Sequence, residues 1–200
     1  MQLEGKVTLV TGAGRGIGKS IAIGFARQGA NVVAVSRTLS EVEDIARTIK
    51  AMGMGALAIQ ADVSRLQDVI SMTEQVQNRF SRLDVLVNNA ALRMNHLGNK
   101  SSYLIPFTDL TVEDWDQAIN VNLRGPFLCI KTLLPLIGAS GGGSIINISA
   151  GGGKRGMAGR APYCASKFGL EALTRAIARA QKSRAAGARA PAVGSSQPMD

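Results

Sequence analysis

The stretch Thr11-Gly12-Ala13-Gly14-Arg15-Gly16-Ile17-Gly18 follows a short apolar run, residues 7–10, and precedes an amphipathic segment. Glycine allows a tight turn with positive φ and lets the backbone approach a ligand with no Cβ in the way. A helix that begins here would present free N–H groups and the positive end of its dipole. Between a strand and a helix, such a turn predicts that Gly12, Gly16 and Gly18 bind the phosphates of a nucleotide.

A P-loop, G-x-x-x-x-G-K-[ST], is the alternative interpretation of this turn. Gly18-Lys19-Ser20 matches the end of that motif, and Lys19 would then bind phosphates. The position of the first P-loop glycine is occupied by Ala13, however. We therefore prefer a dinucleotide-binding turn, and the rest of the chain favours it as well.

Short runs rich in β-branched residues alternate with amphipathic helical segments along the chain. The runs show almost no apolar/polar alternation, which is typical of strands buried on both faces. This order predicts a doubly wound, Rossmann-type α/β fold: a parallel sheet with helices on both faces. The predicted strands are residues 7–10, 32–35, 56–59, 85–87 and 144–148.

Composition suits a globular protein, because 46% of the 200 residues are hydrophobic and 18% are charged. We expect residues 1–180 to form one dinucleotide-binding and catalytic domain. Residues 181–200 contain two glycines, two prolines and no apolar run, so we expect a disordered tail there. The two cysteines lie 35 positions apart and only one histidine is present, so we expect no disulfide framework and no metal site.

The net charge of +9 raises the question of a nucleic-acid partner. A nucleic-acid surface needs clustered basic residues with stacking aromatics, but the basic residues are scattered and aromatics make up only 4% of the chain. No apolar stretch reaches membrane-spanning length, and the N-terminus lacks a signal-peptide pattern. We therefore expect a cytoplasmic protein that binds neither nucleic acid nor membrane.

Further motifs follow the glycine turn in order: Asp62-Val63, Asn88-Asn89-Ala90, Asn122 and Tyr163-x-x-x-Lys167. The series resembles the short-chain dehydrogenase/reductase family, over residues 5 to about 180. The resemblance implies a nicotinamide dinucleotide cofactor. It also implies hydride transfer to or from the carbonyl or alcohol carbon of a small molecule.

Tyr163 and Lys167 lie four positions apart, hence on one face if the segment is helical. A tyrosine with a pKa near 10 is a poor acid or base at neutral pH, and a neighbouring ammonium favours the phenolate. The resemblance implies that Tyr163 exchanges a proton with the substrate oxygen while Lys167 also holds the nicotinamide ribose. Asn122 resembles the asparagine that anchors a proton-relay water. The alternative is an exposed Tyr and Lys without a catalytic role.

The resemblance also assigns the adenosine half of the cofactor site. Asp62 resembles the residue that contacts the adenine amino group, with Val63 packed beside it, although Asp62 also suits a plain strand-end cap. Asn89 and Ala90 resemble the segment that lines the adenosine ribose. Ile17, within the glycine turn, is also predicted to bind the cofactor.

The choice of cofactor can be argued from charge. An acidic residue after the second strand would bind the ribose 2′-hydroxyl and repel a 2′-phosphate. Here that strand ends Val35-Ser36-Arg37, and Arg15 lies in the glycine turn on the same side. Two guanidinium groups and no acid favour NADP(H), with NAD(H) as the alternative.

One departure from the family pattern concerns a serine. Members of the family place a substrate-binding serine 13 positions before the tyrosine, where this chain has Ala150. Ser149 is the neighbouring catalytic candidate, but on an extended strand it points to the opposite face. Either the strand ends early enough to reorient Ser149, or the hydrogen bond that polarises the carbonyl is missing. The alternative function is therefore a cofactor-binding protein with weak or no catalysis.

The second departure follows Arg179, where the family's last strands and its Pro-Gly turn have no counterpart. The fifth strand should then become a sheet edge and expose apolar surface. We further expect the helices at 112–137 and 163–179 to support a homo-oligomer.

A long polar connection, residues 91–110, either borders the substrate cleft or is an exposed insertion. A 3-oxoacyl thioester is one substrate that basic residues around this cleft would suit, although they also fit a solvated rim. The basic residues concerned are Arg93, Lys154, Arg155 and Arg160.

Overall fold

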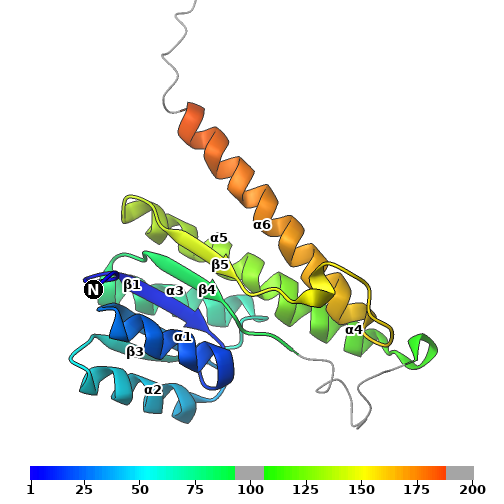
Figure 1. Ribbon diagram of the computed structural model, residues 1–200, viewed down its shortest axis with the longest axis horizontal. Helices are drawn as coiled ribbons and strands as arrows, with labels where there is room; N and C mark the ends of the chain where they lie inside the picture. Colours follow the sequence, from blue (N-terminus) through cyan, green and yellow to red (C-terminus); the bar gives the residue numbers. More distant parts are fainter. Residues whose placement is uncertain (93–105, 188–200) are drawn as a thin grey trace, which may run out of the picture.

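A computed structural model describes residues 1–92 and 106–187, and it contains one five-stranded parallel sheet (Figure 1). The strand order is β3-β2-β1-β4-β5. All five predicted strands are present within about two residues of their expected bounds. The strands are β1 (Val7–Thr11), β2 (Asn31–Ser36), β3 (Ala56–Gln60), β4 (Val85–Asn88) and β5 (Ser144–Asn147).

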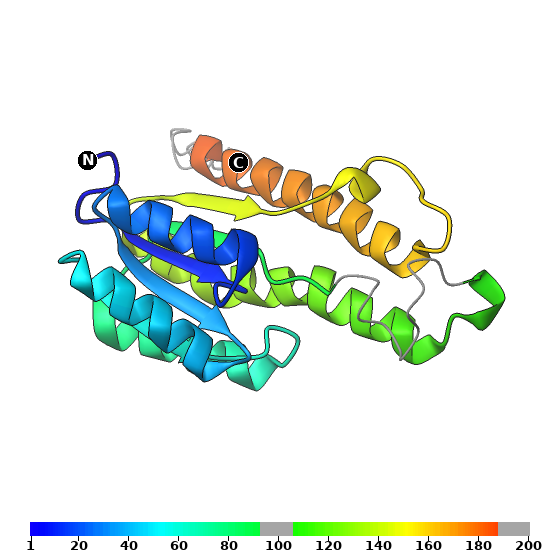
Figure 2. The same cartoon turned by 60° about the horizontal axis from the view of Figure 1, so that its bottom comes forward.

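Helices cover both faces of the sheet, which confirms the doubly wound fold. In Figures 1 and 2, α1 and α2 lie on one face, and α3, α5 and α6 lie on the other. A π-helical turn, Asn120–Arg124, joins α4 to α5. The helices are α1 (Gly16–Arg27), α2 (Leu39–Ala51), α3 (Leu66–Phe80), α4 (Val112–Ile119), α5 (Gly125–Ala139) and α6 (Ala161–Gly187).

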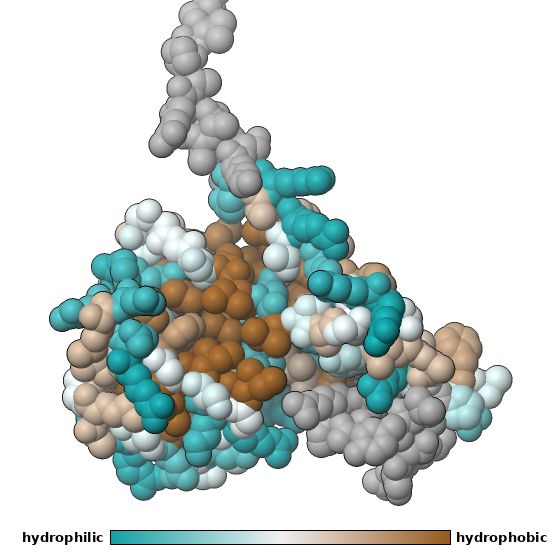
Figure 3. Space-filling view, in the orientation of Figure 1, coloured by the Kyte–Doolittle hydropathy of each residue, from teal (hydrophilic) through white to brown (hydrophobic). Residues whose placement is uncertain are grey.

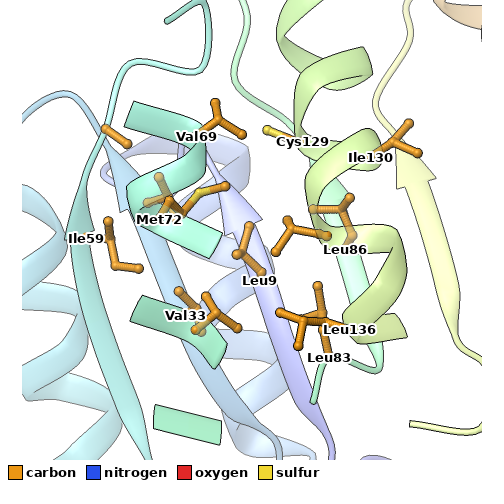
Figure 4. Close-up of a cluster of buried hydrophobic side chains, with 14 of the residues drawn as sticks. Leu9, Val33, Ile59, Val69, Met72, Leu83, Leu86, Cys129, Ile130 and Leu136 are labelled. Atoms are coloured by element: carbon orange, nitrogen blue, oxygen red, sulfur yellow. The ribbon is translucent and has the colours of Figure 1, made fainter. Parts of the chain in front are cut away.

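Two apolar layers hold the helices on the sheet. Between the sheet and α3 and α5, buried side chains such as Leu9, Met72 and Leu86 interdigitate (Figure 4). The opposite layer, under α1 and α2, is built from valine, isoleucine and many alanines, which let the helices approach closely. Cys129 belongs to the first layer, and its burial raises the pKa of the thiol to about 12, so this cysteine is a packing residue. Both cysteines are free.

The winding direction of the sheet reverses between β1 and β4. The chain runs from β1 outward through β2 to β3, and then crosses back to the other side of β1 to form β4. In doubly wound sheets, ligands bind at the carboxyl ends of the strands where the winding direction reverses. The glycine turn after β1 and the Asn89 segment after β4 therefore meet at this point.

β5 is the edge of the sheet, as the sequence predicted. Its burial alternates between exposed and intermediate, and Ile146 keeps 41% of its surface accessible. Figure 3 shows apolar side chains gathered in the middle of the face that carries α1. The expected apolar surface beside β5 is thus confirmed.

The boundary predicted near residue 180 is wrong for the backbone, because α6 continues to Gly187. Residues 181–186 contain neither glycine nor proline and include good helix formers, so nothing ends the helix before Gly187. Residues 188–200 lie outside the described part, and so do 93–105, including Arg93. Within the described ranges, no helix is both long and apolar enough to span a membrane.

Candidate active site

The glycine turn adopts the backbone that only glycine accepts readily, with φ of +63° at Gly12 and +55° at Gly16. A Cβ on Gly12 would lie 2.8 Å from the Cα of Ala90, and one on Gly18 would overlap the carbonyl oxygen of Gly12. A Cβ on Gly16, by contrast, would meet no atom within 4 Å. The turn is therefore packed tightly on its inner side and open at the start of α1, which fits the pyrophosphate of a dinucleotide.

Hydrogen bonds from the end of β4 hold this turn in place. Asn89 Nδ2 donates to the carbonyl oxygens of Thr11 at 3.0 Å and Gly12 at 3.1 Å. The Thr11 hydroxyl accepts from the backbone N–H groups of Asn89 and Ala90 at 3.0 and 3.1 Å. Asn89, predicted to line the ribose, thus uses its amide to brace the turn. Thr11 was missed as a site residue, and its position just before the first glycine was the available signal.

Arg15 and Ile17, both within the turn, are exposed. Arg37, directly after β2, is exposed as well. Gln60 Nε2 donates to the carbonyl oxygen of Arg37 at 2.9 Å and so ties the end of β2 to β3. Sequence reasoning missed Glu41, in the first turn of α2, whose carboxylate occupies the space next to Gly14. This side of the turn is therefore not purely basic.

Asp62 makes the contacts of a strand-end cap. Its Oδ1 accepts from the backbone N–H and the hydroxyl of Ser64 at 2.9 and 2.7 Å. Val63 is 6% exposed, and its side chain packs so closely on Gly125 that a Cβ there would lie 2.9 Å from Val63 Cγ2. The capping role is thus observed, while the adenine contact remains a prediction.

Lys167 is 3% exposed, and its Nζ donates to the carbonyl oxygen of Ile148 at 2.8 Å. Nζ also lies 5.9 Å from the centre of the Tyr163 ring, so the two side chains share one face of α6 as expected. Burial lowers the pKa of Lys167 to about 8. The alternative of an exposed lysine is wrong.

Asn122 is fully buried in the π-helical turn and joins three segments. Its Oδ1 accepts from Leu92 N at 2.7 Å, and its Nδ2 donates to Leu92 O at 3.0 Å and to Ser166 Oγ at 3.2 Å. The Ser166 hydroxyl in turn donates to the carbonyl oxygen of Tyr163 at 2.7 Å. Asn122 therefore ties the exit of β4 to the helix that carries the tyrosine. Ser166 was missed because only its fold neighbours reveal its role.

The Ser149 hydroxyl donates to Glu171 Oε1 on α6 at 3.0 Å. Ala150, at the family's serine position, has extended backbone and offers no hydroxyl. Ser149 is thus hydrogen-bonded to α6, and its predicted catalytic role stays a prediction.

These features define an α/β protein built to bind a dinucleotide beside a tyrosine–lysine pair. The family model described as short chain dehydrogenase matches residues 6–193. The chain belongs to the short-chain dehydrogenase family, whose members are oxidoreductases.

Curated relatives include two 3-oxoacyl-[acyl-carrier-protein] reductases. The one from Staphylococcus aureus is 39% identical over 180 residues, covering 90% of this chain and 70% of the relative. The one from Pseudomonas aeruginosa is 38% identical over 185 residues, covering 92% of this chain and 71% of the relative. The chain therefore spans about seven-tenths of the length of these enzymes.

Two solved structures share the fold. A metagenomic short-chain oxidoreductase in complex with NADP has a TM-score of 0.82 and 35% identity, over 92% of this chain and 79% of the other. The second structure, from Sinorhizobium meliloti, is described as a short-chain alcohol dehydrogenase. It has a TM-score of 0.82 and 34% identity, over 91% of this chain and 69% of the other.

Proposed function

We propose that this protein uses NADP(H) to reduce the carbonyl group of a small molecule, with a 3-oxoacyl thioester as the favoured substrate. The observation that carries the proposal is the buried Lys167, held by the Ile148 carbonyl with its Nζ 5.9 Å from the Tyr163 ring. The reductase relatives and the NADP-bound structural relative support the substrate class and the cofactor.

The glycine turn and the start of α1 would hold the pyrophosphate, and Arg15 and Arg37 would hold a 2′-phosphate. When bound, the reduced nicotinamide supplies the hydride. Tyr163 then gives its hydroxyl proton to the substrate oxygen, so that a carbonyl becomes an alcohol. Lys167 stabilises the resulting phenolate, because its ammonium lies on the same face of α6.

A second candidate function is cofactor binding with weak turnover. It is favoured by Ala150, which leaves the carbonyl oxygen without the family's serine donor, and by the engagement of Ser149 with Glu171. Removing one such donor costs roughly a hundredfold in rate.

The experiment that separates these functions measures binding and turnover on the same sample. NADPH binding is followed by fluorescence of Trp115, the single tryptophan, and turnover by loss of NADPH absorbance with a 3-oxoacyl thioester. Turnover that Tyr163→Phe abolishes without loss of NADPH binding supports the reductase. Binding without turnover supports the second candidate, and no binding contradicts both.

A homo-oligomer in the cytoplasm belongs to the same proposal. Large apolar side chains stay exposed on the helices expected to associate: Val112, Trp115, Phe127 and Phe168. Sedimentation of the protein at increasing concentration tests this, and a monomer at every concentration would contradict it.

A further inference from the structure

Three polar side chains of α6 face the end of β5. Lys167, Glu171 and Thr174 are spaced four and three residues apart, which places them on one side of the helix. Each hydrogen bonds to a residue in the segment 147–149. Polar contacts as well as packing therefore join α6 to the end of β5.

Two of these contacts join side chain to side chain. Asn147 Nδ2 donates to Thr174 Oγ1 at 2.8 Å, and Ser149 Oγ donates to Glu171 Oε1 at 3.0 Å. Asn147 and Ser149 are two residues apart at the end of β5, and these contacts show that both point toward α6. Neighbouring side chains on an extended chain point to opposite sides, so Ser149 faces the helix and the side chain at position 150 faces away from it.

The turn after β5, Gly151–Gly153, closes over the Ser149–Glu171 pair. Its last residue, Gly153, is buried, and a Cβ there would lie 2.6 Å from Ser149 Oγ and 2.7 Å from Glu171 Oε1. Glu171 is thus the point where strand, turn and helix meet. On its solvent side, Arg175 NH2 lies 3.4 Å from Glu171 Oε2.

We propose that Glu171 is a positioning residue: by holding Ser149 and the turn at Gly151–Gly153, it fixes where α6 sits along β5. Lys167 lies one helical turn before Glu171, and Tyr163 lies about two turns before it, so displacement of Glu171 along the axis moves both. A shift of about 1 Å in catalytic groups can cost around a hundredfold in rate. The kinetic part of the test rests on the proposed function, and the structural part does not.

The structural test uses trypsin on the full chain, because Lys154 and Arg155 are exposed directly after the turn. We expect Glu171→Ala and Ser149→Ala each to speed cleavage there at least about fivefold, since the turn opens more often. The double variant should be cleaved no faster than either single variant, because each single variant already removes the same Ser149–Glu171 hydrogen bond. Unchanged cleavage in Glu171→Ala, or effects that multiply in the double variant, would overturn the proposal.

Two matched variants separate the hydrogen bond from general damage. Glu171→Gln keeps an acceptor for Ser149 and should cleave within about twofold of the natural chain. Arg175→Ala removes an exposed side chain that contacts the carboxylate and the carbonyl oxygen of Glu171, and it should leave cleavage and turnover unchanged. If Glu171→Gln behaves as Glu171→Ala does, the hydrogen bond is not the cause and the proposal fails.

The kinetic test compares kcat with NADPH affinity. We expect Glu171→Ala to lower kcat about tenfold or more while the NADPH dissociation constant changes less than about threefold, because the glycine turn is untouched. Glu171→Gln should restore kcat. Equal kcat in all variants would contradict the positioning role, whereas absence of turnover in the natural chain would contradict only the proposed function.

Discussion

Lys167 Nζ donates to the carbonyl oxygen of Ile148 at 2.8 Å while the lysine is 3% exposed. A backbone carbonyl at the end of the edge strand is thus the hydrogen-bond partner of the buried ammonium. Within the described part of the chain, no carboxylate pairs with Lys167 to compensate for the water that its ammonium loses. Burial therefore lowers the pKa of Lys167 to about 8. The lysine can therefore change its charge close to physiological pH.

The stability of the protein should rise with pH between about 8 and 10.5, the range between the folded and ordinary pKa of Lys167. In this range the unfolded chain holds a proton that the folded chain has lost. The cost of burying the ammonium is fully present below pH 8 and is relieved as pH increases. The gain is at most about 3.4 kcal/mol, at 1.36 kcal/mol per pKa unit.

Urea unfolding of the natural chain and of Lys167→Met at pH values across this range checks the prediction. The methionine variant should lack this component of the rise, since it has no proton to lose. Parallel pH curves for the two proteins would contradict the assigned burial cost.

Arg37→Asp should weaken NADPH binding by at least about tenfold and leave NADH binding within about threefold. The reason is that a carboxylate repels a 2′-phosphate and accepts from a ribose hydroxyl. Cofactor titrations by Trp115 fluorescence measure both affinities. Arg47→Asp makes the same charge change on an exposed part of α2 and serves as the control. An equal loss for both cofactors would count against the NADP assignment.

Gly18→Ala should abolish cofactor binding or folding of the turn, because the added Cβ overlaps the Gly12 carbonyl oxygen. Gly24→Ala, in the same helix, meets no atom within 4 Å and should stabilise the protein by up to about 1 kcal/mol. Thermal unfolding together with NADPH titration measures both effects. Similar behaviour of the two variants would show that the turn does not depend on this close approach.

Ala150→Ser should raise kcat for carbonyl reduction, by up to about a hundredfold if the new hydroxyl reaches the substrate oxygen. The affinity for NADPH should not change, because position 150 lies outside the glycine turn. Ala161→Ser, at the start of α6, adds a hydroxyl elsewhere and is the matched control. Unchanged or lower turnover in Ala150→Ser would reject the missing-donor explanation.

Periodicity and local motifs were sufficient to predict most of the fold. The five strands followed from runs of β-branched residues, and the cofactor turn followed from glycines placed between a strand and a helix. The extension of α6 to Gly187 was missed because helix-forming residues were grouped with the Gly- and Pro-rich stretch that follows them. Nothing in the sequence pattern of residues 181–186 opposes a helix.

The hydrogen-bond partners of the polar site residues were harder to predict from the sequence. Asn89 was assigned to the ribose, yet its amide braces the glycine turn, and Asn122 spans Leu92 and Ser166. These contacts join residues between 30 and 78 positions apart, and a spacing rule describes only neighbours on one element.

The sequence by itself determined the family, the order of strands and helices, and the pairing of Tyr163 with Lys167 on one helical face, because these depend on local periodicity and motif spacing. Only the tertiary structure decided that Lys167 is buried against Ile148 and that Ser149 faces Glu171. Burial and hydrogen-bond partners depend on which elements pack together, and that arrangement sets both the pKa of the lysine and the direction of the serine.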